Sequence, residues 1–231
     1  MQIESSGDYR QPRETGKIFF MCTLYADIAA QEAHRRIFGV ENDLAGNLAP
    51  MSAIYPDGIA PVVGIGQNGK RGMVKMRWGF PPPPVFGNRP VVNVRNTKSG
   101  YWKKYLEPEY RCLVPAPSFC EWTDSQPKTP TWFALSEKRP LFAFAGIWRK
   151  WNGTRGTKKD PVEGDHLLYS FLTTEPNADV KPIHSKAMPV ILHEDEWETW
   201  LTAPADKALK LQRPLPKGVL RIVARGDRRD G

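Results

Sequence analysis

The most reactive chemistry this sequence offers lies at a cysteine that directly follows a methionine, Met21-Cys22. If Met21 is removed, Cys22 carries a free α-amine and a thiol on adjacent carbons. Such a 1,2-aminothiol condenses with an aldehyde to an imine, and the thiol then closes a five-membered thiazolidine ring. An α-amine has a pKa of ~7.7–8, so more of it is neutral at pH 7 than of a lysine, whose pKa is ~10.4. The stretch therefore predicts an aldehyde-capturing nucleophile, whereas an uncut chain would use Cys22 as a small core residue.

Three further polar residues stand in apolar surroundings. Asn93 interrupts the run VVNV, Glu121 interrupts FCEW, and His184 opens the segment HSKAMP before an apolar strand. Imine formation needs a proton donor and a proton acceptor, and a carboxyl and an imidazole can divide these tasks. Each residue also has a structural explanation: Asn93 as a strand-end hydrogen bonder, Glu121 as the partner of an arginine, and His184 as a loop histidine. Their spacing alone does not bring them together.

Basic and aromatic residues alternate in the first half of the chain, and the formal net charge is +8. This balance favours a polyanionic partner. Aromatic rings beside cations can stack on unpaired bases of single-stranded nucleic acid, although the same pattern fits solvated charges and core aromatics. On this pattern the residues expected to face DNA are Arg77, Trp78, Phe80, Lys103 and Lys104.

Length and composition indicate one globular domain. The 231 residues include 40% hydrophobic residues, 22 prolines and 19 glycines, which favours a loop-rich fold of short strands. Three cysteines without a CxxC pair indicate neither a disulfide framework nor a zinc site, and no cofactor is predicted. The expected setting is the reducing cytoplasm, with the protein a monomer and with no membrane partner, since no apolar run approaches ~20 residues. Residues 1–20 are expected to be an extension, either disordered, a pro-segment or a misassigned start, before a domain at 21–231.

Hydrophobic periodicity predicts an α+β domain in which short strands predominate. Helices are expected at 27–38, with Asp27 as N-cap and Gly39 as the stop, and at 101–106 and 194–201. Strands are expected at 21–25, 74–78, 91–96, 112–115, 119–122, 132–135, 141–148, 167–174, 189–192 and 219–223. The strands at 132–135 and 141–148 are expected to form one hairpin, and 149–165 a surface loop.

Six segments occur in an order that resembles the SOS response-associated peptidase family, in a form similar to its alphaproteobacterial branch. They are MC (21–22), NLAP (47–50), RWGFPPPP (77–84), NVRN (93–96), RCLVPAPSFCEW (111–122) and IHSKAMPVIL (183–192). The resemblance spans about residues 21–223. It implies a mostly antiparallel, barrel-like β core with a few peripheral helices.

The resemblance also implies a function. Members of the family bind single-stranded DNA and trap the ring-opened aldehyde of an abasic site as a thiazolidine DNA–protein crosslink. By motif position, Cys22 supplies amine and thiol, and Asn93 holds the cysteine or the sugar. Glu121 and His184 handle the proton transfers. Arg95 would contact a phosphate, and Thr173 would line the pocket. Weak lyase activity is implied as a side reaction, because the imine can eliminate the 3′-phosphate.

This sequence departs from the family pattern after Cys22, where Thr23-Leu24-Tyr25 stands in place of the usual Gly-Arg, and at Cys120, which replaces an aromatic residue. The preceding residues block the amine unless translation starts at Met21 or the chain cleaves itself before Cys22. Two other hypotheses stay open. One is a thiol (auto)peptidase with Cys22 as nucleophile and His184 as base. The other is a non-catalytic single-strand binder.

Overall fold

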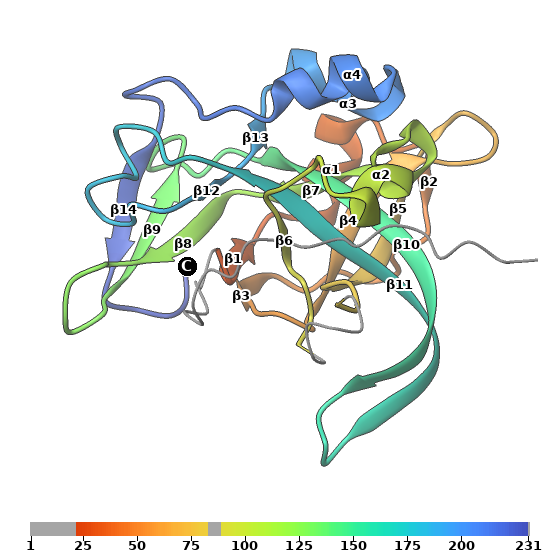
Figure 1. The fold of residues 1–231 in the computed structure, drawn as a ribbon, viewed down its shortest axis with the longest axis horizontal. Coiled ribbons are helices and arrows are strands. Elements are labelled where there is room, and N and C mark those ends of the chain that lie inside the picture. The colour runs from red at the N-terminus through yellow and green to blue at the C-terminus, as the bar shows by residue number, and fades with distance from the viewer. Residues whose placement is uncertain (1–21, 83–88, 231) are drawn as a thin grey trace, which may run out of the picture.

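A five-stranded barrel forms the centre of the computed structural model, which describes residues 22–82 and 89–230 (Figure 1). Its strands are β4 (Ile59–Ile65), β5 (Arg71–Trp78), β7 (Arg111–Ala116), β10 (Phe142–Gly156) and β11 (Pro161–Thr174). Neighbouring strands are antiparallel except β5 and β11, whose parallel pairing closes the ring. The predicted extension at 1–20 lies outside the described residues, and its separation from one domain at 21–231 stays a prediction.

A second, antiparallel sheet packs beside the barrel. It has the order β14-β9-β8-β1-β3, with bounds β14 (Arg221–Arg225), β9 (Pro130–Ala134), β8 (Ser118–Trp122), β1 (Leu24–Asp27) and β3 (Met51–Ile54). The chain passes from the barrel to this sheet through Pro117, which joins β7 directly to β8. Buried aromatic residues such as Phe119, Phe144 and Phe171 fill the space within and between the two units. The predicted mostly β fold with a barrel-like core is confirmed.

Four short strands attach to the barrel. β2 (Asn42–Asp43) runs parallel to β5, and β6 (Asn93–Val94) runs parallel to β11. The other two, β12 (Met188–Pro189) and β13 (Ile191–Leu192), follow β11 in the chain. β12 pairs with the end of β11, and β13 pairs with the start of β10. Residues 188–192 therefore bridge the end of β11 and the start of β10, and they place the preceding loop, which contains His184, at this end of the barrel.

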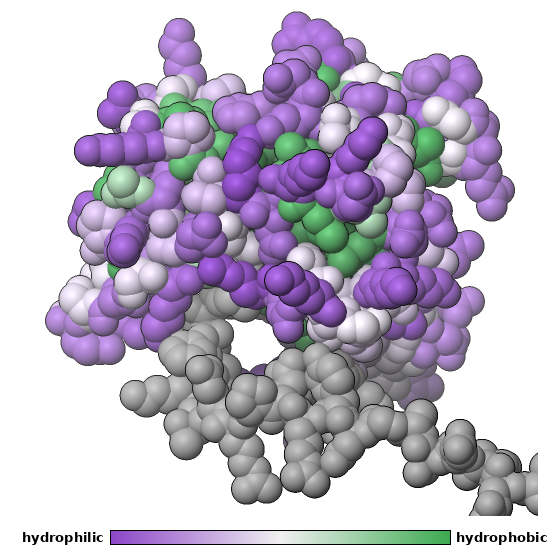
Figure 2. Space-filling view, turned by 45° about the horizontal axis from the view of Figure 1, so that its top comes forward, coloured by the Kyte–Doolittle hydropathy of each residue, from purple (hydrophilic) through white to green (hydrophobic). Residues whose placement is uncertain are grey.

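Short helices cover the outside of the barrel. They are α1 (Gln31–Phe38), α2 (Gly100–Lys103), α3 (Trp197–Thr202) and α4 (Ala205–Ala208), with 3₁₀ turns at Lys104–Leu106, Pro108–Tyr110, Glu194–Glu196 and Leu209–Leu211. Phe38 of α1 stacks on Trp197 of α3, with ring centroids 4.6 Å apart. Seen from the helical side, most of the surface is hydrophilic, with hydrophobic residues in small separate areas (Figure 2). Among the described residues, no helix is long and apolar enough to cross a membrane.

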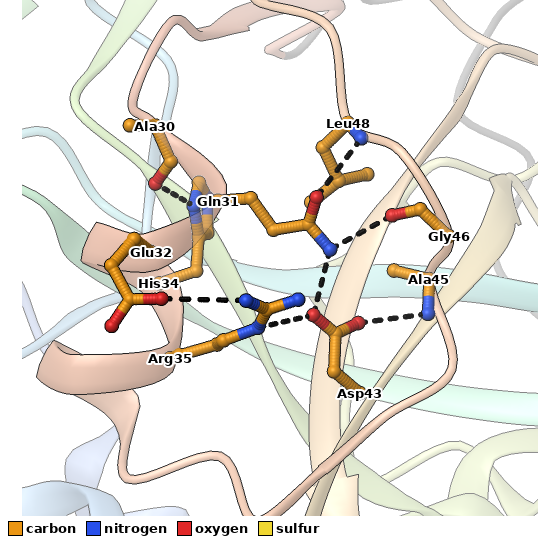
Figure 3. Close-up of polar contacts among 9 residues, drawn as sticks. All are labelled: Ala30, Gln31, Glu32, His34, Arg35, Asp43, Ala45, Gly46 and Leu48. Carbon is orange, nitrogen blue, oxygen red and sulfur yellow. Dashed lines mark hydrogen bonds and ion pairs between the residues drawn. The ribbon is translucent and has the colours of Figure 1, made fainter.

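Helix α1 begins later than predicted, at Gln31 instead of Asp27. Asp27 is the last residue of β1, and its buried carboxylate lies 2.9 Å from His34 Nε2, so it does not cap the helix. The Gln31 side chain instead ties the helix to strand β2, because Nε2 donates to Asp43 Oδ2 at 2.7 Å (Figure 3). The predicted stop is confirmed: Gly39 is left-handed, with φ of 61°.

The predicted hairpin of 132–135 with 141–148 and the predicted surface loop at 149–165 are both wrong. β9 pairs with β8 and β14 in the second sheet, whereas β10 pairs with β7, β11 and β13. β10 and β11 extend through most of 149–165 as a two-stranded arm that projects from the barrel (Figure 1). The arm is anchored at Arg155, whose Nε donates to Asp57 Oδ1 at 2.8 Å. The sequence of the arm is polar because the arm projects away from the hydrophobic core, and a polar sequence of this kind also predicts a surface loop.

Candidate active site

The four residues predicted to be catalytic meet in the structure, although they come from four separate segments. Cys22 precedes β1, Asn93 opens β6, Glu121 lies in β8, and His184 lies in the turn before β12. All four are buried, with between 0 and 7% of their surface exposed. Asn93 Nδ2 donates a 2.7 Å hydrogen bond to the carbonyl oxygen of Cys22. The amide therefore fixes the backbone of the cysteine.

The thiol of Cys22 is protonated at neutral pH. Its Sγ lies 3.7 Å from the carbonyl oxygen of Leu24 and 4.0 Å from that of Cys120. Burial raises the pKa of this thiol well above its usual value, and the nearby Glu121 carboxyl raises it further. A resting thiolate is thus disfavoured here.

Glu121 is the second ionisable group of the site. It is 1% exposed, and its Oε1 has no hydrogen-bond partner among the described residues. Burial raises the pKa of this carboxyl well above its usual value, and the charge of Asp124 adds to the shift, whereas the Cys22 thiol opposes it. A carboxyl in such surroundings holds its proton and can act as an acid.

His184 faces both carboxyl groups. Its Nε2 lies 3.9 Å from Glu121 Oε2, and its Nδ1 lies 3.5 Å from Asp124 Oδ1. Burial lowers the pKa of the imidazole, and the Asp124 carboxylate opposes that shift. A neutral imidazole beside a protonated carboxyl gives the site a proton acceptor and a proton donor together.

Asp124 is a site residue that the sequence reasoning missed. Its Oδ2 accepts two hydrogen bonds from Ser185, at 2.8 Å from the backbone nitrogen and 2.6 Å from Oγ, and these bonds lower the pKa of the carboxyl. This pairing holds the turn after β8 against the loop of His184. The signal available in the sequence was an Asp three residues after Glu121 in a polar turn.

We expect Asp124→Asn to lower the pKa of His184 further. The carboxylate favours the charged imidazolium, so replacing it by an amide removes that stabilisation while an oxygen remains to accept from Ser185. An NMR titration of the His184 ring in both proteins measures the change. Asp206→Asn, on exposed α4, is the matched control and should leave the titration unchanged. An unchanged or raised pKa in Asp124→Asn would contradict the electrostatic role.

Two residues predicted to contact DNA lie beside Asn93. Arg95 follows β6 with 40% of its side chain exposed and a guanidinium nitrogen 3.5 Å from Glu175, and Thr173 is buried at the end of β11. Gln212 joins them, since its Nε2 donates to the carbonyl oxygens of Arg95 and Thr173 at 2.9 and 3.0 Å. Arg95 therefore lies at the exposed edge of the site, and Thr173 is buried next to it.

The prediction that Trp78 and Phe80 face DNA is wrong. Both are fully buried. Trp78 stacks on Phe171 at 5.1 Å between ring centroids and donates from Nε1 to the carbonyl oxygen of Val92. The Trp78 ring packs inside the barrel and the Phe80 ring packs under α2, so no base can stack on either ring in this fold.

The other three residues predicted to contact DNA lie on elements that hold none of the four buried site residues. Arg77 Nη1 donates to the carbonyl oxygen of Asp57 at 2.8 Å, so its guanidinium is engaged at the β3–β4 turn. Lys103 and Lys104 are exposed at the junction of α2 and the 3₁₀ turn that follows it, on the outside of the barrel. The structure thus groups Arg95 and Thr173 with the candidate site but not these three residues.

Within the described part of the chain, no cluster of three or more His, Cys, Asp or Glu side chains is arranged to hold a metal ion. The cysteines are unpaired and buried.

Comparison with known proteins agrees with this arrangement. The sequence profile of the family described as "SOS response associated peptidase (SRAP)" matches residues 21–224. The chain is 34% identical to the abasic site processing protein YoaM of Bacillus subtilis over 68% of this chain and 67% of that protein. It is 29% identical to the abasic site processing protein HMCES of Gallus gallus over 63% of this chain and 50% of that protein.

Solved structures support the fold. A crystal structure of a protein from Bordetella bronchiseptica superposes with a TM-score of 0.69 at 21% identity, covering 89% of this chain and 98% of that chain. The family profile extends over the barrel and the second sheet, and it includes all four buried site residues. The chain therefore belongs to the SOS response-associated peptidase family.

Proposed function

We propose that this protein binds single-stranded DNA and captures the ring-opened aldehyde of an abasic site as a covalent thiazolidine through Cys22. The observation that carries the proposal is the convergence of Cys22, Asn93, Glu121 and His184 in one buried site. Three relatives from Bacillus subtilis, at 32–34% identity, are named abasic site processing proteins, which supports the same substrate.

The chemistry follows from the protonation states of the site. The α-amine of Cys22 adds to the aldehyde carbon, and the resulting carbinolamine loses water to form an imine. Glu121, kept protonated by burial, donates the proton that lets water leave, while neutral His184 accepts the proton of the amine. The thiol sulfur then adds to the imine carbon and its proton passes to nitrogen. The net reaction releases one water and closes the ring.

The reaction requires a free amine at Cys22. In the 231-residue chain the nitrogen of Cys22 is bonded to Met21. Hydrolysis of this one peptide bond, with water supplying the new carboxylate and amine, would produce the aminothiol. Self-cleavage by the same site is part of the proposal, as is a weak lyase reaction in which the imine eliminates the 3′-phosphate.

A thiol peptidase is the second candidate, since the family is described as a peptidase. Its resting state would need a thiolate close to an imidazolium. Here burial raises the pKa of the Cys22 thiol and lowers that of His184, which disfavours that ion pair. A non-catalytic single-strand binder is the third candidate, and it would retain DNA binding without any adduct. Monomeric action in the cytoplasm and the alphaproteobacterial branch stay predictions.

The mass of the protein tests the proposal. A chain that starts at Cys22 and the full chain are each incubated with an abasic single-stranded oligonucleotide and measured by intact-mass spectrometry. The proposal expects the shorter chain to gain the mass of the oligonucleotide less one water. It expects the full chain to gain it only after losing residues 1–21. A shorter chain that binds the DNA without a mass gain would support the binding module instead.

Asn93→Ala is expected to slow adduct formation by about tenfold. Its side chain makes the 2.7 Å bond to the Cys22 carbonyl, and a catalytic group that loses its orientation loses rate at this scale. Single-turnover kinetics with saturating abasic DNA measure the effect. Asn152→Ala, on the projecting arm, is the control and should match the parent rate. Equal rates for Asn93→Ala and the control would remove Asn93 from the mechanism.

A further inference from the structure

A groove opens in the barrel wall where β7 begins. β7 lies between β4 and β10, and its first residue, Arg111, pairs with Ile147. Level with Arg111, β4 ends at Ile65 and turns back towards β5 at Gly66, whereas β10 continues beyond Ile147 with no further described strand on the side where β7 was paired. The resulting cavity has a volume of about 680 Å³ and is bordered by Ile65–Gln67, Lys104, Tyr105, Tyr110 and Trp148–Lys150. It lies beside the 3₁₀ turn at Lys104–Leu106, which follows α2.

The groove is separate from the Cys22 site. Arg111 begins β7, and Ala116 ends it before β8 carries the chain to Glu121. At ~3.3 Å per residue, β7 spans about 17 Å between these ends. A ligand in the groove would therefore not touch the aminothiol.

Aromatic rings form the floor of the groove. Tyr110 is half-buried between Tyr105 and Trp148, with ring centroids 5.6 and 6.3 Å away. Unlike Trp78 and Phe80, Tyr110 and Trp148 keep part of their surface open to solvent. Partly open rings of this kind bind planar, unsaturated groups by stacking.

Cations border these rings. Lys104 Nζ lies 5.3 Å from the centre of the Tyr110 ring, and the guanidinium of Arg149 lies 5.1 Å from that of Tyr105. Lys150 adds a third cation, which is exposed like Lys104 whereas Arg149 is half-buried, and the lining contains one carboxylate, Glu109. The balance favours an anionic ligand.

A buried arginine near the groove adds to the positive charge of these cations. Arg111 is 1% exposed, and its Nη2 donates to the carbonyl oxygen of Ala203, next to the lining residue Thr202. Its Nε and Nη1 have no hydrogen-bond partner among the described residues. The Trp200 ring lies 5.4 Å away and gives only a cation–π contact. This guanidinium, which follows Tyr110 in the chain, adds positive charge near the groove, and the Glu107 and Glu109 carboxylates offset part of it.

We propose that this groove is a second nucleic-acid contact that holds one nucleotide of single-stranded DNA, and this rests on and extends the function proposed above. The base stacks against Tyr110 and Trp148, and the phosphate lies among Lys104, Arg149 and Lys150. Stacking combined with cations is the usual way proteins hold single strands without sequence preference. An acidic peptide would satisfy the cations but leave the aromatic floor unused. The groove thus anchors the strand at a distance from the damaged nucleotide.

Photocrosslinking tests the location. The full chain is irradiated with an undamaged oligonucleotide of about 10 nucleotides that contains 5-iodouracil, and the crosslinked peptides are identified by mass spectrometry. The expected crosslinks are at Tyr110 or Trp148. Crosslinks found only outside the groove would overturn the proposal.

Charge reversal tests the energetics by fluorescence anisotropy with the same undamaged DNA. Lys104→Glu combined with Lys150→Glu is expected to weaken binding about tenfold or more at low salt and to reduce the salt dependence, because two phosphate-facing cations are lost. Tyr110→Ala is expected to weaken it about tenfold, and Tyr110→Phe should retain binding. Lys138→Glu, exposed in the β9–β10 connection, is the matched control. Groove variants that bind as tightly as the control would overturn the proposal.

The abasic-site adduct is measured on the same preparations. If the parent protein forms no adduct but its DNA binding is weakened by the groove substitutions, the aldehyde chemistry proposed for Cys22 is wrong and the groove proposal stands. If the adduct forms normally but the groove substitutions leave DNA binding unchanged, the groove proposal is wrong and the aldehyde chemistry stands.

Discussion

A chain that begins at Cys22 is expected to form a heat-stable adduct with abasic single-stranded DNA, and Cys22→Ser is expected to lose it almost completely. Serine keeps the α-amine, so the imine still forms, but a hydroxyl adds poorly to an imine carbon and water reverses the reaction. We expect at least a hundredfold less stable adduct. Denaturing gel electrophoresis after heating measures it.

Borohydride reduction separates the two steps of this prediction. Reduction of the Cys22→Ser imine should trap a covalent product, because the amine chemistry is intact. Acetylation of the N-terminus should abolish both the stable and the trapped product. If Cys22→Ser without reduction gave as much stable adduct as the parent, the thiol would have no part in ring closure. Cys112→Ser, at a buried cysteine on β7, controls for general thiol effects.

Glu121→Gln is expected to slow adduct formation by about a hundredfold or more. Loss of a positioned proton donor costs 10²–10⁴ in rate, and the amide keeps the volume of the side chain but cannot supply an acidic proton. Rapid-quench kinetics of the chain starting at Cys22 measure the rate. A rate within twofold of the Glu137→Gln control, on an exposed loop, would exclude Glu121 as the acid.

Glu121→Gln should also become more stable relative to the parent protein as the pH rises. Folding raises the pKa of Glu121, so between its ordinary value and the raised one the native state binds the extra proton. The stability of the parent therefore falls with rising pH in that window, by up to about 1.4 kcal/mol per pH unit, whereas the amide of the variant does not titrate. Thermal unfolding of both proteins from pH 5 to 8 should show a difference that grows with pH. A constant difference would mean that Glu121 is already ionised.

The residues that meet in the candidate site were easier to single out from the sequence than the surfaces around them. Cys22, Asn93, Glu121 and His184 stood out as polar or reactive residues, but only their positions in motifs that resemble the family grouped them. The structure brings them together, and their catalytic roles stay a proposal. Trp78 was assigned wrongly, because an aromatic ring beside arginines gives the same sequence pattern whether it faces DNA or a barrel interior. Only the closure of β5 on β11 determines which face is inside.

Strand positions were also easier to predict than strand partners. Most expected strands exist, but β9 and β10 belong to different sheets even though a short polar turn joins them. Local patterns report alternation along one strand, whereas pairing depends on contacts distant in sequence. Asp124 was missed for the same reason, because its role depends on Ser185, 61 residues away.

The segment that bridges the ends of β10 and β11 has a consequence for the timing of synthesis. His184 and strands β12 and β13 come more than 160 residues after Cys22, and β14 must still pair with β9. Contacts this distant form late, so a growing chain on the ribosome carries Cys22 and Glu121 long before it can assemble the site. The proton donor and acceptor of the proposed site can therefore come together only when nearly the whole polypeptide has been made.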